Sequence, residues 1–191
     1  FRAGEAGQWA PFTAEQTLSP EGFLWRAEMG EGARRIRGGD YYYKGSARVL
    51  FRAWGFVTVM RMEDPNTARS AAGRLAGELL MLPSALLPRE GVRWLEAEPG
   101  VALAEVKVGE ETLRLRIALR EDASPERLVY DRWGLDPKTE EPAYIPFRVD
   151  FPEPETFGGY RIPGGYAAGW APEGEPFAPF IEAEIAGARF R

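Results

Sequence analysis

Cysteine and histidine are both absent from this sequence of 191 residues. The chain therefore cannot form disulfides, hold zinc or iron through thiolate or imidazole ligands, or use an imidazole as a catalytic base. It also lacks a glycine-rich phosphate loop and a dinucleotide-binding fingerprint. We predict no metal and no cofactor, and any catalysis would have to use carboxylate, tyrosine, lysine or arginine groups, with no catalytic residue identified.

Long runs of one charge and long apolar runs are also missing. The chain has 24 basic and 29 acidic residues, a net charge of -5, so its composition shows no electrostatic footprint for nucleic acid or for an anionic membrane surface. No segment approaches the roughly 20 apolar residues of a transmembrane helix. We predict no nucleic-acid partner and no transmembrane segment.

The length of the chain predicts one soluble domain over residues 1–191. The sequence starts at Phe1, within a predicted strand, so a signal, an anchor or another domain can have preceded it. An extracytoplasmic or membrane-associated location is favoured over a cytoplasmic one. The oligomeric state is left open.

Alternation of apolar and polar residues is the commonest pattern. In residues 23–29, Phe23, Trp25, Ala27 and Met29 fall on one face, as in a half-buried strand. Residues 41–62 predict two or three strands, interrupted at Gly45 and Gly55. Further strands are predicted at 101–108, 112–119, 127–133, 144–151, 160–166 and 180–185. Many short strands indicate a sandwich, a barrel or a strongly curved antiparallel sheet.

One segment has helical periodicity. Apolar residues recur at helical spacing after Asp64 and Pro65, which suit a helix start, so we predict an amphipathic helix over 66–82. The residues on its apolar face are Ala68, Ala71, Ala72, Leu75, Ala76 and Leu79. Arg69 lies on the wetter flank, where its replacement by alanine should cost only about 0.5 kcal/mol.

Asp40, next to three tyrosines that include Tyr42, is the densest polar and aromatic group. A carboxylate near a phenol can act as a general acid or base, or orient a ligand hydroxyl. Against this, Gly38-Gly39-Asp40 is typical of a turn, and we favour that interpretation.

Charged residues on and near the helix supply further candidates. Arg74 and Glu78, one helical turn apart, could face a ligand head group or the sheet, or form only a surface ion pair. Arg132 could pair with Glu78 or Asp40, or could face solvent.

Six tryptophans could wall a hydrophobic cavity, although burial in an ordinary core explains them as well and is favoured. They are Trp9, Trp25, Trp54, Trp94, Trp133 and Trp170.

Several motifs together resemble an uncharacterised bacterial family, a domain of unknown function. They are Trp9-x-Pro11-Phe12-x-Ala14-x-Gln16, Phe23-x-Trp25-x-Ala27, Asp40-x-Tyr42-x-x-Gly45, Arg74-Leu75-Ala76-Gly77-Glu78 and Gly159-Tyr160-Arg161-Ile162-Pro163. The chain departs from the pattern at Met81, where an aromatic is expected, and at Ala47, where a second glycine is expected. The resemblance implies membership without a known activity.

The order of elements is more distantly similar to the lipoprotein-sorting proteins, an open half-barrel whose helices cover its concave face and which takes up acyl chains. That resemblance implies a mainly β fold, with the 66–82 helix packed on a curved antiparallel sheet, and a lipid or other hydrophobic ligand held between them. The candidate ligand-binding residues are Trp9, Trp25, Asp40, Tyr42, Arg74, Glu78, Met81, Trp94 and Arg132. Two alternatives remain: an enzyme that uses carboxylate and tyrosine chemistry around Asp40, and a structural or interaction domain of a larger envelope protein.

Overall fold

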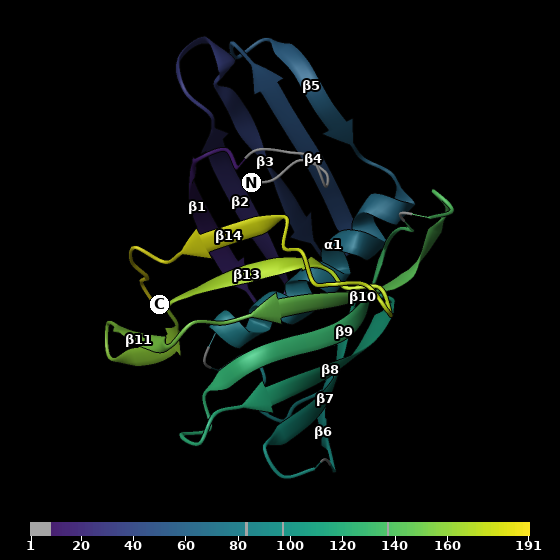
Figure 1. Cartoon of the computed structure of the whole chain (residues 1–191), viewed down its shortest axis with the longest axis vertical. Coiled ribbons are helices and arrows are strands. Elements are labelled where there is room, and N and C mark those ends of the chain that lie inside the picture. Colours follow the sequence, from purple (N-terminus) through teal and green to yellow (C-terminus); the bar gives the residue numbers. More distant parts are fainter. Residues whose placement is uncertain (1–8, 83, 97, 137) are drawn as a thin grey trace.

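The computed structural model describes residues 9–82, 84–96, 98–136 and 138–191 (Figure 1). The strands before the helix are β1 (Phe12–Ser19), β2 (Gly22–Met29), β3 (Ile36–Tyr43), β4 (Ser46–Ala53) and β5 (Val57–Met62). The strands after it are β6 (Val92–Leu95), β7 (Val101–Val108), β8 (Glu111–Leu119), β9 (Pro125–Leu135), β10 (Pro142–Asp150), β11 (Pro154–Phe157), β12 (Tyr160–Pro163), β13 (Gly165–Trp170) and β14 (Ile181–Glu184). The helical segments are α1 (Pro65–Glu78) and two short 3-10 helices, η1 (Gly32–Arg34) and η2 (Leu79–Met81).

Strands β1 to β5 form an antiparallel N-terminal sheet in chain order. The alternation predicted in 23–29 is confirmed, since Phe23, Trp25 and Ala27 are buried on one face. The predicted segment 41–62 contains the last three residues of β3 and all of β4 and β5. Gly45 and Gly55 lie in the turns between these strands with φ of 87° and 79°. Glycine reaches such angles without steric cost.

The turn predicted at Gly38-Gly39-Asp40 is wrong, because these residues lie inside β3. Gly38 is paired with Phe51 of β4, and a β-carbon at position 38 would lie 2.7 Å from Cδ1 of that ring. The glycine therefore makes room for an aromatic ring on the inner face of the sheet.

The C-terminal sheet is also antiparallel, with the order β14-β13-β10-β9-β8-β7-β6, and β11 and β12 form a separate hairpin. The predicted strand 160–166 is divided by Gly164 into β12 and β13. The strand predicted at Phe1 lies outside the described residues. A mainly antiparallel β fold with one α-helix and open sheets is confirmed for the described residues.

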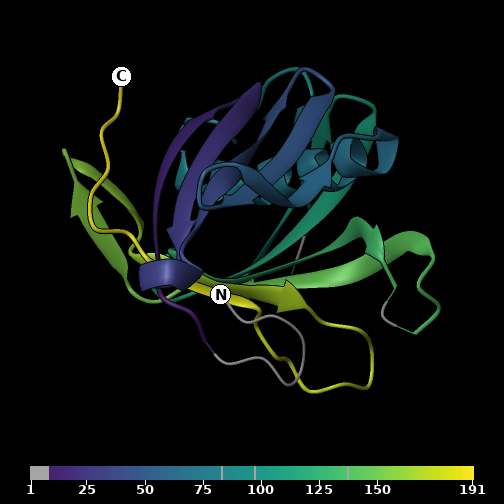
Figure 2. The same cartoon turned by 90° about the horizontal axis from the view of Figure 1, so that it is seen from above.

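Helix α1 lies between the two sheets and contacts β3 and β4 on one side and β7 to β9 on the other (Figure 2). It begins at Pro65, and the Asp64 side chain accepts a hydrogen bond of 2.8 Å from the Thr67 backbone N–H. The α-helix ends at Glu78, and η2 continues it to Met81, so the predicted 66–82 helix is confirmed apart from its last turn. The residues buried on its apolar face include Ala71, Ala72, Leu75 and Ala76.

No helix in the described ranges combines the length and the apolar character needed to cross a membrane. That residues 1–191 form a single domain stays a prediction.

Candidate functional site

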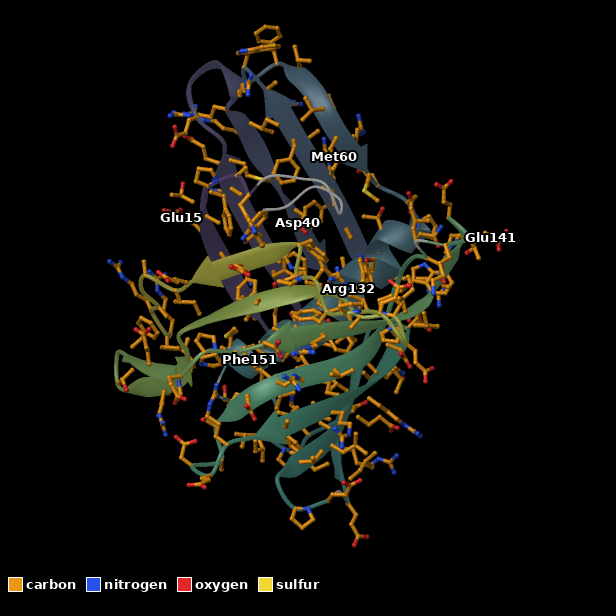
Figure 3. All side chains as sticks on the ribbon, viewed as in Figure 1. Glu15, Asp40, Met60, Arg132, Glu141 and Phe151 are labelled. Carbon is orange, nitrogen blue, oxygen red and sulfur yellow. The ribbon has the colours of Figure 1, made fainter. Side chains whose placement is uncertain are left out.

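A charged cluster joins the last turn of α1 to the inner face of the N-terminal sheet. The Arg74 guanidinium lies 2.6 Å from Oδ2 of Asp40 in β3 and 2.6 Å from Oε1 of Glu78. These three side chains are only 18%, 17% and 21% exposed. The predicted pair of Arg74 and Glu78 is thus joined to the N-terminal sheet by the ion pair between Arg74 and Asp40. The side chain of Asp40 is labelled on this sheet in Figure 3.

Gln16 of β1 completes this cluster. Its amide nitrogen donates a hydrogen bond of 2.7 Å to Oε2 of Glu78, and its amide oxygen accepts one of 3.4 Å from Arg74. The strand pairing explains the convergence, because Gln16, Trp25 and Asp40 are cross-strand neighbours in β1, β2 and β3 and share a face of the sheet. The Oδ1 atom of Asp40 is buried and has no hydrogen-bond partner among the described residues.

Aromatic rings line the Arg74 guanidinium. Its central carbon lies 4.4 Å from the centroid of the Phe23 ring and 5.4 Å from that of Trp25. Trp25 in turn makes edge contacts with Phe12 and Phe51. A cation over aromatic faces is attracted by their quadrupoles, so the rings and the two carboxylates hold Arg74 in one position.

The pKa values of Arg74 and of two nearby tyrosines are shifted by burial and by neighbouring charges. Burial acts to lower the pKa of Arg74, but the carboxylates of Glu78 and Asp40 outweigh it, and the pKa lies above its ordinary value. Burial raises the pKa of Tyr130 in β9 and of Tyr166 in β13 to about 12 each. Both phenols therefore stay neutral at physiological pH and act as polar neighbours without charge.

Arg132 lies beside the cluster, pointing from β9 toward α1 (Figure 3). The predicted ion pair with Glu78 or Asp40 is wrong, and so is the predicted exposure to solvent. Its guanidinium donates a hydrogen bond of 3.1 Å to the Ser70 carbonyl oxygen and lies 4.8 Å from the Phe147 ring centroid. Burial lowers the pKa of Arg132. No carboxylate of the described residues lies within ion-pair distance to offset this effect.

The other predicted site residues are dispersed. Trp9 is exposed ahead of β1, and Met81 lies in η2 against the core. Trp94 lies on β6, where its indole N–H donates to the Leu86 carbonyl oxygen at 2.9 Å. The Tyr42 hydroxyl lies beside Gly109, 2.6 Å from where a β-carbon at that position would be.

The predicted set is thus brought together only in part. Trp25, Asp40, Arg74 and Glu78 meet, with Arg132 next to them, whereas Trp94 and the Tyr42 hydroxyl lie elsewhere. Acid–base catalysis needs groups that reach a common atom, and the Asp40 and Tyr42 side chains do not share such a point.

Sequence reasoning missed Gln16, which belongs to the cluster, and two tyrosines whose titration the cluster influences, Tyr130 and Tyr166. Gln16 stands in the motif Trp9-x-Pro11-Phe12-x-Ala14-x-Gln16, which is the one signal that pointed to it. Tyr130 and Tyr166 lie in the second half of the chain, and only the folding of the C-terminal sheet over α1 brings them close.

The contact between α1 and β9 is closed. A β-carbon at Gly73 would lie 2.9 Å from Cγ of Arg132, and one at Gly77 would lie 2.8 Å from Oη of Tyr130. Leu75 and Ala76 beside them are 0% exposed. A hydrocarbon chain therefore has no room between the helix and this strand.

Residues 1–183 match the model of DUF6544, a family of unknown function. The chain belongs to the DUF6544 family. No curated protein and no solved structure matches it significantly. The predicted resemblance to a domain of unknown function is therefore confirmed, while the similarity to the lipoprotein-sorting proteins stays a prediction.

A second polar group joins the start of α1 to the C-terminal sheet. Arg69 donates a hydrogen bond of 2.8 Å to Glu111 and one of 2.9 Å to the Tyr144 hydroxyl, which itself donates to Glu111. The guanidinium stacks 3.5 Å from the Trp133 ring centroid. Because Glu111 is buried, the prediction that Arg69 is a dispensable flank residue does not fit its contacts.

Two surface depressions lie at β6 to β8. Charged side chains predominate in their linings, and none of the predicted ligand-binding residues contributes. Among the described residues, no three carboxylates are grouped so that they could hold a metal ion.

Proposed function

We propose that this domain binds an amphipathic, lipid-like molecule. Its hydrocarbon part lies along the inner face of β1 to β4 beyond the helix, and its polar end meets the Asp40 cluster. The observation that supports the proposal most directly lies on the inner face of β1. Ala14 and Gln16 are exposed there, although their neighbours Ala27 and Trp25 on β2 are buried. The sheet thus offers an apolar strip beside a charged cluster, and this strip is open along β1, at Ala14.

The strip consists of apolar side chains from four strands. Its members are Phe12 and Ala14 of β1, Trp25, Ala27 and Met29 of β2, Ile36 of β3, and Phe51 and Ala53 of β4. Helix α1 reaches the sheet at Asp40, and the strands continue past it (Figure 1). Lining of this kind, mostly apolar with a few converging polar groups, is typical of small-molecule sites.

The polar end of the ligand should carry hydrogen-bond donors. Oδ1 of Asp40 is a buried acceptor without a partner in the described ranges, and such an atom normally finds a donor in a ligand or in water. Arg74 already uses Oδ2 of the same carboxylate. A long-chain alcohol or amine supplies the missing donor, whereas a fatty acid would bring a second anion toward Asp40 and Glu78.

The test combines identification of a native ligand with a blocking substitution. Organic extracts of purified protein, analysed by mass spectrometry, should contain an amphipathic molecule at near-stoichiometric amount. Ala14→Phe should then weaken binding of a fluorescent long-chain alcohol or amine by about tenfold, because the ring fills the open part of the strip. Thr13→Phe adds the same ring to the exposed outer face of β1 and serves as the matched control.

Two results would contradict the proposal. One is equal binding by the Ala14→Phe and Thr13→Phe variants. The other is tighter binding of the fatty acid than of the alcohol or amine of the same chain length, which is the opposite of what the Asp40 acceptor requires.

A further inference from the structure

Two connections meet at one end of the N-terminal sheet. The β2–β3 connection contains η1, and the β4–β5 turn consists of Trp54, Gly55 and Phe56. Because Ile36 is paired with Ala53, the two connections are neighbours, and Figure 1 shows them at the end of the sheet that points away from the C-terminal sheet. We call this surface the sheet tip.

The sheet tip carries the two most exposed large apolar side chains of the described residues. Trp54 is 64% exposed and Phe56 is 76% exposed, and neither ring has an aromatic or hydrogen-bond partner among the described residues. Trp54 also adopts a φ of 52°. A bulky residue in the left-handed region is strained, and the turn itself would favour asparagine, aspartate or glycine there. The turn geometry therefore gives no reason for an indole at this position.

Arginines surround these two rings. The sheet tip holds Arg34, Arg35, Arg37 and Arg52 against two glutamates, Glu28 and Glu31, so it is locally basic on a chain with a net charge of -5. Arg35 and Arg37 share Glu28.

Two of these cations have no anionic partner. Arg34 and Arg52 form no ion pair with any described residue, and Arg52 lies directly opposite Arg37. Like charges placed opposite each other destabilise a sheet, so an anion outside the chain would relieve the repulsion.

We propose that the sheet tip docks onto an anionic lipid bilayer surface. Trp54 and Phe56 enter the interfacial region, where aromatic side chains accumulate, and the surrounding arginines contact the lipid phosphates. The charge count of the whole chain could not reveal this surface, because its arginines come from β3, β4 and the segment before β3. The inference goes beyond the proposed ligand strip, since Trp54 and Phe56 are not part of that strip.

A second copy of the chain is a poorer occupant of this surface. The edge strand β5 is exposed along its length and could pair with another β5. Such pairing would cover the backbone edge of residues 57–62. It would leave Trp54 and Phe56 uncovered, because the β4–β5 turn lies beyond the ends of the strands, and it would not cover Arg34 in the β2–β3 connection.

The experiment is co-sedimentation with vesicles of phosphatidylcholine alone or with 30% phosphatidylglycerol. The double variant Trp54→Asn with Phe56→Ser keeps a residue that tolerates positive φ in the turn, and it should lower partitioning to anionic vesicles by at least tenfold. Arg34→Ala with Arg52→Ala should lower it by about 25-fold, since each basic residue contributes roughly fivefold. Tyr43→Ala, at the turn on the opposite end of the sheet, is the control and should bind as the unmodified chain does.

Three outcomes would overturn the inference: equal binding to neutral and anionic vesicles, unchanged vesicle binding by the Trp54 and Phe56 variant, or an unmodified chain that is a dimer in size-exclusion chromatography and that the Trp54 and Phe56 substitutions convert to a monomer without changing its vesicle binding. Because Ala14→Phe leaves the sheet tip intact, that variant should still bind vesicles. Failure of the ligand proposal is thereby distinguished from failure of membrane docking.

Discussion

Gly77 of α1 lies directly against the hydroxyl of Tyr130. A β-carbon at position 77 would be 2.8 Å from Oη and 3.2 Å from the nearest ring carbons. The helix backbone can approach β9 this closely only because position 77 has no side chain. This contact fixes how deeply the helix sits between the two sheets.

Gly77→Ala should therefore destabilise the fold, although alanine in a helix is ordinarily better than glycine by about 1 kcal/mol. We expect a net loss of roughly 1 to 3 kcal/mol from overpacking, measured by urea unfolding. Combining it with Tyr130→Phe should recover part of the loss, because the hydroxyl is the nearest atom. A stabilised Gly77→Ala variant would show that the helix can shift away from β9.

Arg69→Ala should cost about 2 kcal/mol, because it leaves Glu111 buried without its cation. Thermal melts of Arg69→Ala, Glu111→Gln and the double variant form a mutant cycle, in which the double variant should be less destabilised than the sum of the single ones. Arg61→Ala is the control, since its partner Glu63 is exposed and the change should stay within about 0.5 kcal/mol. Additive effects at Arg69 and Glu111 would contradict this view.

Leu75→Asp should destabilise the protein by several kcal/mol, because it places an unpaired carboxylate where the leucine is 0% exposed. Leu87→Asp makes the same chemical change at a leucine that is 60% exposed, and its melting temperature should change little. Equal, small shifts for the two variants would mean that α1 is not docked between the sheets.

Stability should fall as the pH rises from about 10 toward 12. Burial raises the pKa of Tyr130 and Tyr166 to about 12, whereas an unfolded tyrosine titrates near 10. Between these values the unfolded chain releases protons that the folded chain keeps. Unfolding is then favoured by up to about 1.4 kcal/mol per pH unit for each tyrosine.

Urea unfolding at pH 8, 10 and 11 measures this slope. Tyr130→Phe and Tyr166→Phe should each reduce it, and the double variant should reduce it most. A slope that is the same in all four proteins would assign the pH dependence to other groups.

Local patterns were sufficient to predict several elements from the sequence. The alternation around Trp25 predicts β2, and the start signal at Asp64 and Pro65 predicts α1, because both depend on neighbouring residues alone. Gly38 and Gly39 were wrongly predicted to form a turn, because two glycines have the same local composition whether they form a turn or lie in a strand such as β3, where the neighbouring strands leave no room for a β-carbon.

The candidate site was predicted less completely than the fold. Arg74 and Glu78 could be paired from their helical spacing, but their link to Asp40 and Gln16 depends on how the helix crosses the sheet. Arg132 was expected either to pair with Glu78 or Asp40 or to face solvent, whereas its guanidinium contacts a carbonyl oxygen and the Phe147 ring. Such partners are separated by many residues in the sequence and cannot be read from spacing.

Helix α1 stands between the two halves of the chain, and each half builds its own sheet. During synthesis, which proceeds from the N-terminus, β1 to β5 can pair before the strands of the second sheet have left the ribosome. The newly made helix can then rest on β3 and β4, but the side that will meet β7 to β9 stays wet until those strands arrive. The nascent chain therefore passes through a stage in which the side of α1 that will be buried against the second sheet faces solvent, and a chaperone can bind the exposed apolar surface at this stage.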